Sequence, residues 1–421
     1  MKKLTVGILA HRQGNLFQNS KFLSDLVTEG RMLGASVYVF SHKDVNEENR
    51  TIRGFTPISE GRWAGATCPW PDVVIDFCRK LYKPFRDMRR RKDLFVYANH
   101  KFTYKWKAMK LFTESDKLKR WIPKTFLYSP QALEQMIEKH DLVYVKPGNG
   151  TGGHSVLKIK KTGGGYRLQG RKRSGRIVVT PIMTKQRVIR WTNRWVQTEK
   201  IRSGSFMVQQ GLDLQLIPYR QVDARLLIQK NELGNWEVTG KVLRVGAKNS
   251  PTTNLVYGDG KVLAFQTFIK SRFGLDKAKE IELESEELAH RLMEVVEERF
   301  GSMVEFGLDV GIDVKGKVWL IEANPKPGHK AFIKAKELAT YRKSIRRPIQ
   351  YAMHLANEQL IEETNDPFCE QLIEETNDPF CEQVIMETTN LDNGSASSVT
   401  ALGQEQDNEG QKEHLAFIEF P

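Results

Sequence analysis

The sequence predicts an α/β protein that begins with a parallel sheet and crossover helices, continues with mixed strands and helices, and ends in a tail without a core. Two observations predict the first two parts. Over residues 1–100, strand-like apolar runs alternate with a helix-like stretch at the spacing of a parallel sheet. Later, a lysine and a glycine-rich loop separate two strand-like runs, and a strand pair with a tight turn follows around residue 315.

The N-terminal elements follow one another in a regular order. Leu4–Ala10 is predicted to be a buried first strand, Lys21–Leu33 a helix and Ser36–Ser41 the second strand. Pro71–Phe77 and Phe95–Ala98 are predicted to add further strands. No Gly-x-Gly-x-x-Gly follows the first strand, so the sequence does not support a dinucleotide site there.

The apolar runs and the cysteines indicate the cellular compartment that suits this protein. Leu4–Ala10 is too short for a signal peptide, and no run of about 18 apolar residues exists, so we expect no membrane span. None of the four cysteines forms a Cys-x-x-Cys pair: they are Cys68, Cys78, Cys369 and Cys381. A disulfide framework is therefore not expected, and a reducing cytoplasm fits best.

The larger region that follows alternates helices with strands and then becomes rich in strands. Its predicted helices are Lys105–Arg120, Pro130–His140, Thr184–Thr198 and Ser285–Arg299. Its predicted strands are Leu142–Val145, Val156–Lys160, Phe206–Gln210, Asp223–Gln229, Trp236–Val245, Phe306–Val314 and Val318–Ala323. Residues 167–202 contain a strongly basic segment, which we expect to be a surface excursion or part of the wall of an anionic acceptor site.

The C-terminal tail has a different composition. Glu358–Cys369 recurs without change as Glu370–Cys381, and a 12-residue unit with an Asn-Asp-Pro break cannot bury a core by itself. We predict that this tail is disordered or weakly helical. Residues 357–421 carry 16 acidic residues and one lysine, a net charge of −15, so the total of +14 leaves +29 on the rest. That charge is either balanced by the tail or attracts an anionic ligand.

The first chemical motif is the stretch Val143-Tyr-Val-Lys-Pro-Gly-Asn-Gly-Thr-Gly-Gly-His-Ser-Val156. Its glycines let backbone N–H groups approach phosphate oxygens, and Lys146 adds a fixed cation. No Gly-Lys-Ser/Thr ends the loop, so it is not a Walker loop. The alternative is a plain glycine-rich hairpin.

The second motif spans Gly307–Pro327. Glu322 and Asn324 are two positions apart, so on a strand their side chains point to the same face. Asp309 comes from the partner strand. Three oxygen-donating side chains beside a phosphate site suit Mg²⁺, whereas a solvated strand end is the alternative.

Together the two motifs resemble those of the ATP-grasp superfamily, over roughly residues 101–330. The local sequence is most similar to that of the YheC/YheD-like endospore coat-associated family. The matching segments are Val-Gly-Ile-Leu near the start, Lys-Trp-Lys at 105–107, Val-Gln-Gln-Gly-Leu-Asp-Leu and Ile-Glu-Ala-Asn-Pro-Lys-Pro. The resemblance implies a pre-ATP-grasp domain over residues 1–100, a two-lobed ATP-grasp domain over 101–355 with a basic insertion at about 165–205, and the acidic tail over 356–421.

The resemblance also implies nucleotide-binding residues. Lys105, with Lys107 as the competitor, and Lys146 would reach the phosphates. The glycines that would close over the β- and γ-phosphates are Gly148, Gly150, Gly152 and Gly153. The residues that would hold the adenine and ribose are Gln209, Gln210, Gly211, Leu212 and Asp213. Many relatives have an acidic residue where this chain has Gln209, but a glutamine carbonyl also accepts from the adenine amino group.

The remaining implied roles concern the metal and the acceptor. Asp309, Glu322 and Asn324 would bind Mg²⁺, with Mn²⁺ as an alternative metal. Arg225 would face the γ-phosphate and the acceptor, and Arg244 and Asn254 would lie on the acceptor side. Enzymes of this kind convert a carboxylate to an acylphosphate, which an amine or thiol then attacks, releasing ADP and phosphate. ATP, an unknown carboxylate acceptor, and an amine or thiol donor are therefore the implied partners.

The resemblance further implies a place in the mother-cell cytoplasm, with deposition at the spore coat and coat proteins as partners. Two other interpretations stay open. One is a non-catalytic coat protein that keeps a nucleotide-binding shell, which the tail and Gln209 favour. The other is a nucleic-acid binder, which the basic charge favours; no nucleic-acid motif is visible, and we do not expect that partner.

Overall fold

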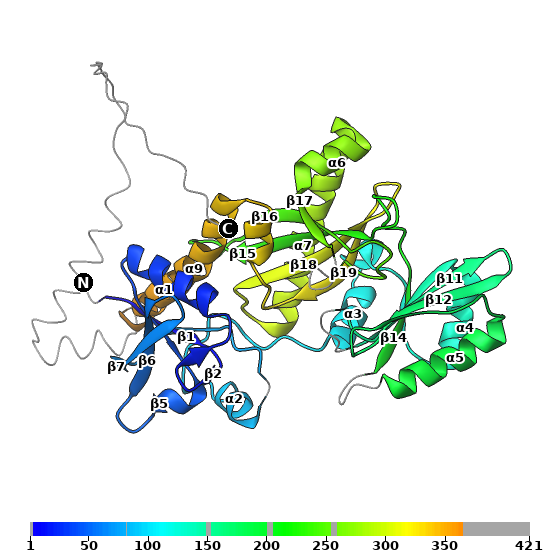
Figure 1. Cartoon of the computed structure of the whole chain (residues 1–421). Coiled ribbons are helices and arrows are strands. Elements are labelled where there is room, and N and C mark those ends of the chain that lie inside the picture. Colours follow the sequence, from blue (N-terminus) through cyan, green and yellow to red (C-terminus); the bar gives the residue numbers. More distant parts are fainter. Residues whose placement is uncertain (1–2, 81, 149–152, 200–204, 254–258, 365–421) are drawn as a thin grey trace, which may run out of the picture. The chain divides into compact units, whose positions relative to one another are not determined.

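The structure is a computed structural model that describes residues 3–80, 82–148, 153–199, 205–253 and 259–364 (Figure 1). Residues Met1–Glu358 form one compact unit, and Gln359–Pro421 group separately. The repeat of the predicted tail extends beyond the described residues. Among the helices of the described ranges, none is long and apolar enough to cross a membrane.

The first sheet has a parallel centre, as the sequence predicts. β1 (Thr5–Leu9) pairs in parallel with β4 (Ser36–Phe40) on one side and with β8 (Val73–Asp76) on the other. α1 (Ser20–Met32) connects β1 to β4 and packs on the sheet. Every residue of β1 is buried, which is typical of a parallel strand covered on both faces.

The rest of this sheet is antiparallel and was not predicted. β6 (Thr51–Ser59) forms a hairpin with β7 (Arg62–Pro69) and pairs antiparallel with β4. The expected strand at residues 95–98 contributes only an isolated bridge between Tyr97 and Val74. The shorter elements are β2 (Arg12–Gln13), β3 (Leu16–Phe17), η1 (His42–Asp44), β5 (Val45–Asn46) and α2 (Lys83–Met88).

A second sheet, with the strand order β13-β12-β11-β10-β14-β9, is antiparallel throughout. The apolar residues of its strands alternate, so one face packs against two helices, α4 and α5, and the other face is left for polar side chains. Ser129 begins α4 by accepting a hydrogen bond from the Ala132 amide at 3.0 Å. The elements are β9 (Thr125–Leu127), α4 (Pro130–Lys139), β10 (Leu142–Pro147), β11 (Val156–Thr162), β12 (Gly165–Arg171), β13 (Ile177–Val179), α5 (Lys185–Thr198) and β14 (Phe206–Gln210).

The described part of the basic segment belongs to this second sheet, so the expected surface excursion is wrong. β12 pairs along its whole length with β11, and α5 buries Val188 and Trp195 in the core. Gly170 leaves room for Trp195, because a Cβ atom there would lie 2.6 Å from the indole ring. The arginines of α5 therefore lie on the outer face of a helix whose inner face is structural.

A third sheet, with the order β17-β16-β15-β18-β19, is also antiparallel, and α7 packs along it through Leu288 and Leu292. The helix expected at residues 105–120 is shorter, since α3 ends at Glu114 and only a 3₁₀ turn follows. The elements are α3 (Lys105–Glu114), η2 (Lys119–Trp121), β15 (Val222–Lys230), β16 (Trp236–Val245), β17 (Lys261–Ala264), α6 (Phe265–Phe273), α7 (Leu275–Phe300), β18 (Glu305–Ile312), β19 (Val318–Asn324), α8 (Lys330–Lys334) and α9 (Leu338–Thr364).

Candidate active site

A cavity of about 780 Å³ is bordered by the second and third sheets and extends to the end of β8 in the first. It gathers most of the residues that the sequence singles out. Those that line it are Lys105, Lys146, Gly153, Gln209, Gln210, Leu212, Arg225, Arg244, Asp309, Glu322 and Asn324. Two motifs that are far apart in the sequence therefore meet in one cleft.

Strand register places the charged residues of the third sheet on one face. Asp309 lies directly opposite Glu322 on β19 and opposite Arg225 on β15. Asn324 is two residues beyond Glu322, so it shares that face, as predicted. On β16, Arg244 lies opposite Asp223, which is two residues before Arg225. A register shift follows Asp309, and such irregularities are common beside functional sites.

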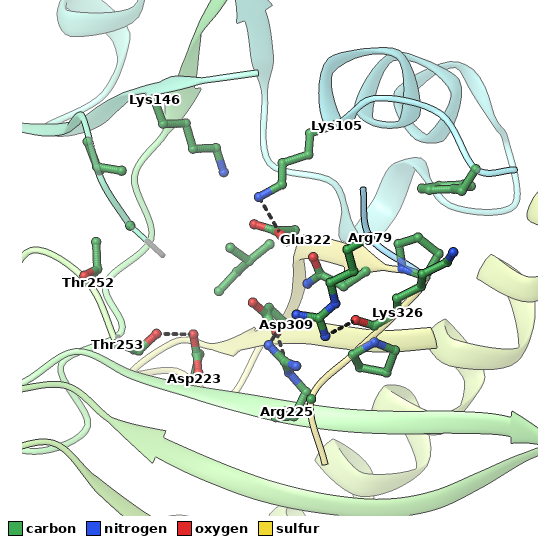
Figure 2. Close-up of a pocket in the computed structure, with 18 of the residues that line it drawn as sticks. Arg79, Lys105, Lys146, Asp223, Arg225, Thr252, Thr253, Asp309, Glu322 and Lys326 are labelled. Atoms are coloured by element: carbon green, nitrogen blue, oxygen red, sulfur yellow. Dashed lines mark hydrogen bonds and ion pairs between the residues drawn. The ribbon is translucent and has the colours of Figure 1, made fainter. Parts of the chain in front are cut away.

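Each carboxylate of this face has a cationic neighbour, and Figure 2 shows two of the pairs, Arg225 with Asp309 and Lys105 with Glu322. Arg225 Nε lies 2.7 Å from Asp309 Oδ1, and Arg244 Nη2 lies 3.0 Å from Asp309 Oδ2. Arg244 also donates two hydrogen bonds of 2.7 Å to Asp223, and the Thr253 hydroxyl donates another to the same carboxylate. The two arginines and two aspartates thus form one continuous network.

Charge pairing outweighs burial at Asp309 and Arg244 of this network, whereas burial dominates at Asp223. Burial alone would raise the pKa of Asp309, but Arg225 and Arg244 lower it below the ordinary value. The pKa of Asp223 is raised, because burial and the charge of Asp309 exceed the effect of Arg244. Arg244 is held fully protonated: burial would lower its pKa, but the two aspartates raise it. Asp309 is therefore the carboxylate that stays ionised most readily.

The donor atoms suit a hard divalent cation. Asp309, Glu322 and Asn324 offer two carboxylates and one amide oxygen on one face, and oxygen donors are what Mg²⁺ prefers. Over the described residues there is no cluster of three or more His, Cys, Asp or Glu side chains arranged for a metal. The candidate set has only two such side chains, so it would rely on other oxygens, such as those of a phosphate, to complete a coordination shell.

The opposite wall of the cleft comes from the polar face of the second sheet. Tyr144 and Lys146 on β10 and Gln209 on β14 point to it, because their neighbours Val145 and Val208 point to the core. Lys146 Nζ donates to Gln209 Oε1 at 2.7 Å, and Gln209 Nε2 donates to Thr125 at 2.8 Å. Burial lowers the pKa of Lys146 to about 8, with Lys105 adding to this and Glu322 and Asp309 opposing it.

Lys105 joins the two walls. Its Nζ lies 2.7 Å from Glu322 Oε1, and Figure 2 shows it reaching into the cleft on the side that faces Lys146. Lys107, the competing candidate, is exposed and does not line the cavity. Among the described residues that border the cavity, Val156, Leu212, Leu214 and Ile321 supply its apolar surface.

Some predicted residues are not brought to the cavity. Asp213 is exposed, and its carboxylate accepts from the Gln215 amide at 3.3 Å. Gly148 is close by but does not line the cavity, and its amide donates to the Ser205 carbonyl at 2.7 Å. Gly150, Gly152 and Asn254 lie outside the described residues.

Other lining residues were not predicted. Asp223 is in the same Asp-x-Arg segment as Arg225, and its period-two spacing could have indicated it. Arg79 and Lys326 come from different parts of the chain, and Arg79 donates to the Lys326 carbonyl at 2.5 Å. No local signal indicates Arg79, because its place in the cavity depends on contacts between the end of β8 and the segment after β19.

A family model described as YheC/D like ATP-grasp matches residues 95–355 of the chain. The chain belongs to this family. Among its relatives, the endospore coat-associated protein YheD of Bacillus subtilis (strain 168) is 26% identical over 365 residues, covering 85% of this chain and 78% of the relative. The endospore coat-associated protein YheC of the same strain is 23% identical over 324 residues, covering 74% and 86% respectively.

Solved structures agree on the fold. The VanG D-Ala:D-Ser ligase from Enterococcus faecalis is similar with a TM-score of 0.51 and 10% identity, over 83% of this chain and 100% of that one. The D-alanyl-alanine synthetase A from Vibrio cholerae has a TM-score of 0.50 and 12% identity, over 86% and 100%. This member of the YheC/D like ATP-grasp family therefore shares its α/β fold with these two enzymes.

Proposed function

We propose that this chain is a Mg-ATP-dependent ligase that joins a carboxylate to an amine or thiol through an acylphosphate. The observation that carries the proposal is the cleft itself. It places Lys105 and Lys146 opposite a sheet face that bears Asp309, Glu322 and Asn324, and it has an apolar section beside Leu212. Membership of the ATP-grasp family supports the same ligand.

The residues divide into two groups by what they would contact. The apolar section, with the Gln209–Leu212 segment, would hold the adenine, while Lys146 and Lys105 would neutralise phosphate charge. Asp309, Glu322 and Asn324 would hold the metal, which when bound would neutralise phosphate oxygens and align them for transfer. Lys105 and Glu322 are paired with each other in the structure. On binding, Lys105 would pair with phosphate and Glu322 with the metal, so neither charge would be left unpaired.

The reaction would consist of two displacements. An oxygen of the acceptor carboxylate attacks the γ-phosphorus, and the bond to the β-phosphate oxygen breaks and leaves ADP. The amine or thiol then attacks the acyl carbon, loses a proton and expels inorganic phosphate. Arg225 would stabilise the charge on the transferring group, and Arg244 would keep Asp309 in position.

A second candidate is a non-catalytic coat protein that binds nucleotide without turnover. The observation that favours it is the description of both curated relatives as endospore coat-associated. Location in the mother-cell cytoplasm and deposition at the coat belong to both proposals. They differ in whether phosphate is released from ATP.

A calorimetric titration with ADP, with and without Mg²⁺, tests the proposed ligand. We expect binding that strengthens with Mg²⁺ and weakens at least about tenfold in Lys146→Ala, because a phosphate-facing cation contributes on the order of 1–3 kcal/mol. Lys107→Ala, an exposed lysine of the same helix as Lys105, is the matched control and should bind like the wild type. No binding at millimolar ADP would contradict the proposal.

A further inference from the structure

The end of the cavity nearest the first sheet carries more positive charge than the proposed nucleotide chemistry uses. Six cationic side chains line this end, and the described lining residue that pairs with any of them is Asp76; Asp309 lies beside one of the six, Arg79 (Figure 2). The cations are Arg79, Arg86, Arg89, Arg90, Lys101 and Lys326.

Asp76 already has its partners. Arg89 Nε lies 2.7 Å from one carboxylate oxygen, and Lys326 Nζ lies 2.8 Å from the same oxygen. Burial would raise the pKa of Asp76, but Lys326 and Arg89 lower it below the ordinary value. Two of the six cations, one at the end of α2 and one in the segment after β19, are therefore paired with the carboxylate at the end of β8.

The other four cations at this end do not pair with Asp76. In the described parts of the chain, Arg79, Arg86 and Lys101 have no carboxylate within ion-pair distance, and the guanidinium of Arg79 donates only to the Lys326 carbonyl. Arg90 makes a loose pair with Asp87 at 3.6 Å on the surface. Arg79, Arg86 and Lys101 are exposed at this end of the cavity, so water screens their mutual repulsion, and an anionic ligand that displaces this water would be attracted by all three.

Arg79 is the cation that reaches the reaction centre. Figure 2 shows its side chain beside Asp309 and Arg225, on the side of the cleft away from Lys146. Burial lowers the pKa of Arg79, the Glu305 carboxylate opposes this effect, and Arg225 lowers the pKa further, so Arg79 is in electrostatic range of both groups. A ligand that extends from Arg79 to Arg225 would contact two arginines from distant parts of the chain, one after β8 and one on β15.

We propose that the acceptor of this ligase carries at least two carboxylates, as in an acidic peptide. One carboxylate is activated beside Arg225, and another is held by Arg79 together with Arg86 and Lys101. This rests on the proposed ligase function. A guanidinium presents paired N–H donors that match a carboxylate, and the cavity volume of about 780 Å³ is near the upper end of the usual range, large enough for two ligands.

Phosphate groups share this chemistry, because guanidinium groups also bind phosphate in a bidentate manner. We assign a polycarboxylate rather than a phosphorylated acceptor. The proposed reaction already requires one carboxylate on the acceptor, and a polycarboxylate supplies the second anionic group by the same chemistry. A phosphorylated peptide without acidic side chains serves as the competing probe.

The test is calorimetry on the full chain saturated with ADP and Mg²⁺. The probes are triglutamate, triglutamine, which has only its terminal carboxylate, and a phosphorylated triserine. We expect triglutamate to bind at least about tenfold more tightly than triglutamine. In Arg79→Ala, triglutamate affinity should fall about tenfold while ADP affinity stays within about threefold, and Arg79→Lys should restore part of the loss.

Arg187→Ala is the matched control, because Arg187 is an exposed arginine on α5 away from the cavity. Equal binding of triglutamate and triglutamine would overturn the assignment. So would tighter binding of the phosphorylated peptide, or an equal loss of triglutamate affinity in Arg187→Ala. Failure of the wild type to bind ADP would sink the ligase proposal instead, so the two failures are distinguishable.

Discussion

At the scale of single residues, the site is organised by pairs of opposite charge. Asp309 lies between Arg225 and Arg244, Glu322 is paired with Lys105, and Lys146 rests against the neutral oxygen of Gln209. Lys146 is thus the cation of this group whose hydrogen-bond partner carries no charge. Its lowered pKa follows from burial without a direct counter-ion.

The pH dependence of ADP binding follows from Lys146. With a pKa of about 8, against 10.5 for an ordinary lysine, it loses its proton as the pH rises from 7 to 9. Phosphate binds the protonated form, so ADP affinity should fall with rising pH, by about tenfold over this range. Calorimetry at pH 7, 8 and 9 measures how steeply ADP affinity falls with pH, and this fall should be absent in Lys146→Met. A variant that keeps the wild-type slope would assign the titration to another group.

Glu322→Gln tests the metal role without changing side-chain size. The amide keeps an oxygen donor but removes a negative charge. The factor by which Mg²⁺ raises ADP affinity should therefore be about tenfold smaller in the variant than in the wild type. Release of phosphate from ATP should also be lost. Glu287→Gln, an exposed glutamate on α7, is the control. A full Mg²⁺ effect in Glu322→Gln would exclude this residue as a ligand.

At the scale of elements, the period of two along the strands makes both walls of the cleft. On β15, Asp223 and Arg225 face the site, whereas Ala224 and Leu226 face the core beneath α7. On β10, Tyr144 and Lys146 face the site, and Val143 and Val145 face the core beneath α4 and α5. A strand that carries proposed site residues on one face is therefore fixed by apolar packing on the other.

Leu226→Ala tests this dependence. Leu226 is fully buried in the core of the third sheet, so the substitution should lower the free energy of unfolding by about 2–5 kcal/mol. Urea unfolding followed by fluorescence provides the measurement. Leu233→Ala, at a leucine that is 66% exposed, should change it by less than about 0.5 kcal/mol. Similar losses in both variants would mean that the sheet face is not the stabilising core.

At the scale of the whole molecule, charge is divided between a basic body of +29 and a tail of −15. The compact unit ends at Glu358, and α9 packs its residues Ile345, Ile349 and Ala352 into the core of the first sheet. The elements that build the cleft all precede that point. Nothing in the described site therefore depends on a residue of the acidic repeat.

Removal of residues 365–421 should accordingly leave the melting temperature and the ADP affinity unchanged, within about 2 °C and about twofold. The truncated chain keeps α9, whose packed residues contribute to the core of the first sheet. Thermal unfolding and calorimetry of the truncated and full chains provide the comparison. A large fall in either quantity would show that the tail supports the compact unit.

The sequence alone predicted the parallel centre of the first sheet, most strands of the other two sheets, and the family. Those features depend on local patterns: apolar runs, strand periodicity, and two motifs that are each contiguous. The shared face of Asp309, Glu322 and Asn324 follows from strand spacing and a short turn, so it was predictable as well. The hairpin of β6 and β7 was missed, since its alternation of apolar and polar residues is weak.

The tertiary structure alone decided which residues meet. That Lys105 rather than Lys107 lines the cleft depends on the rotation of α3 against β19, and the pairing of Arg244 with Asp309 depends on sheet order. The strands of the described basic segment pair with the second sheet, and its helix α5 packs on that sheet. Arg79 lies at the site because the segment after β8 contacts the segment after β19. Contacts between residues distant in the chain carry no local signature, so only the packed fold determines them.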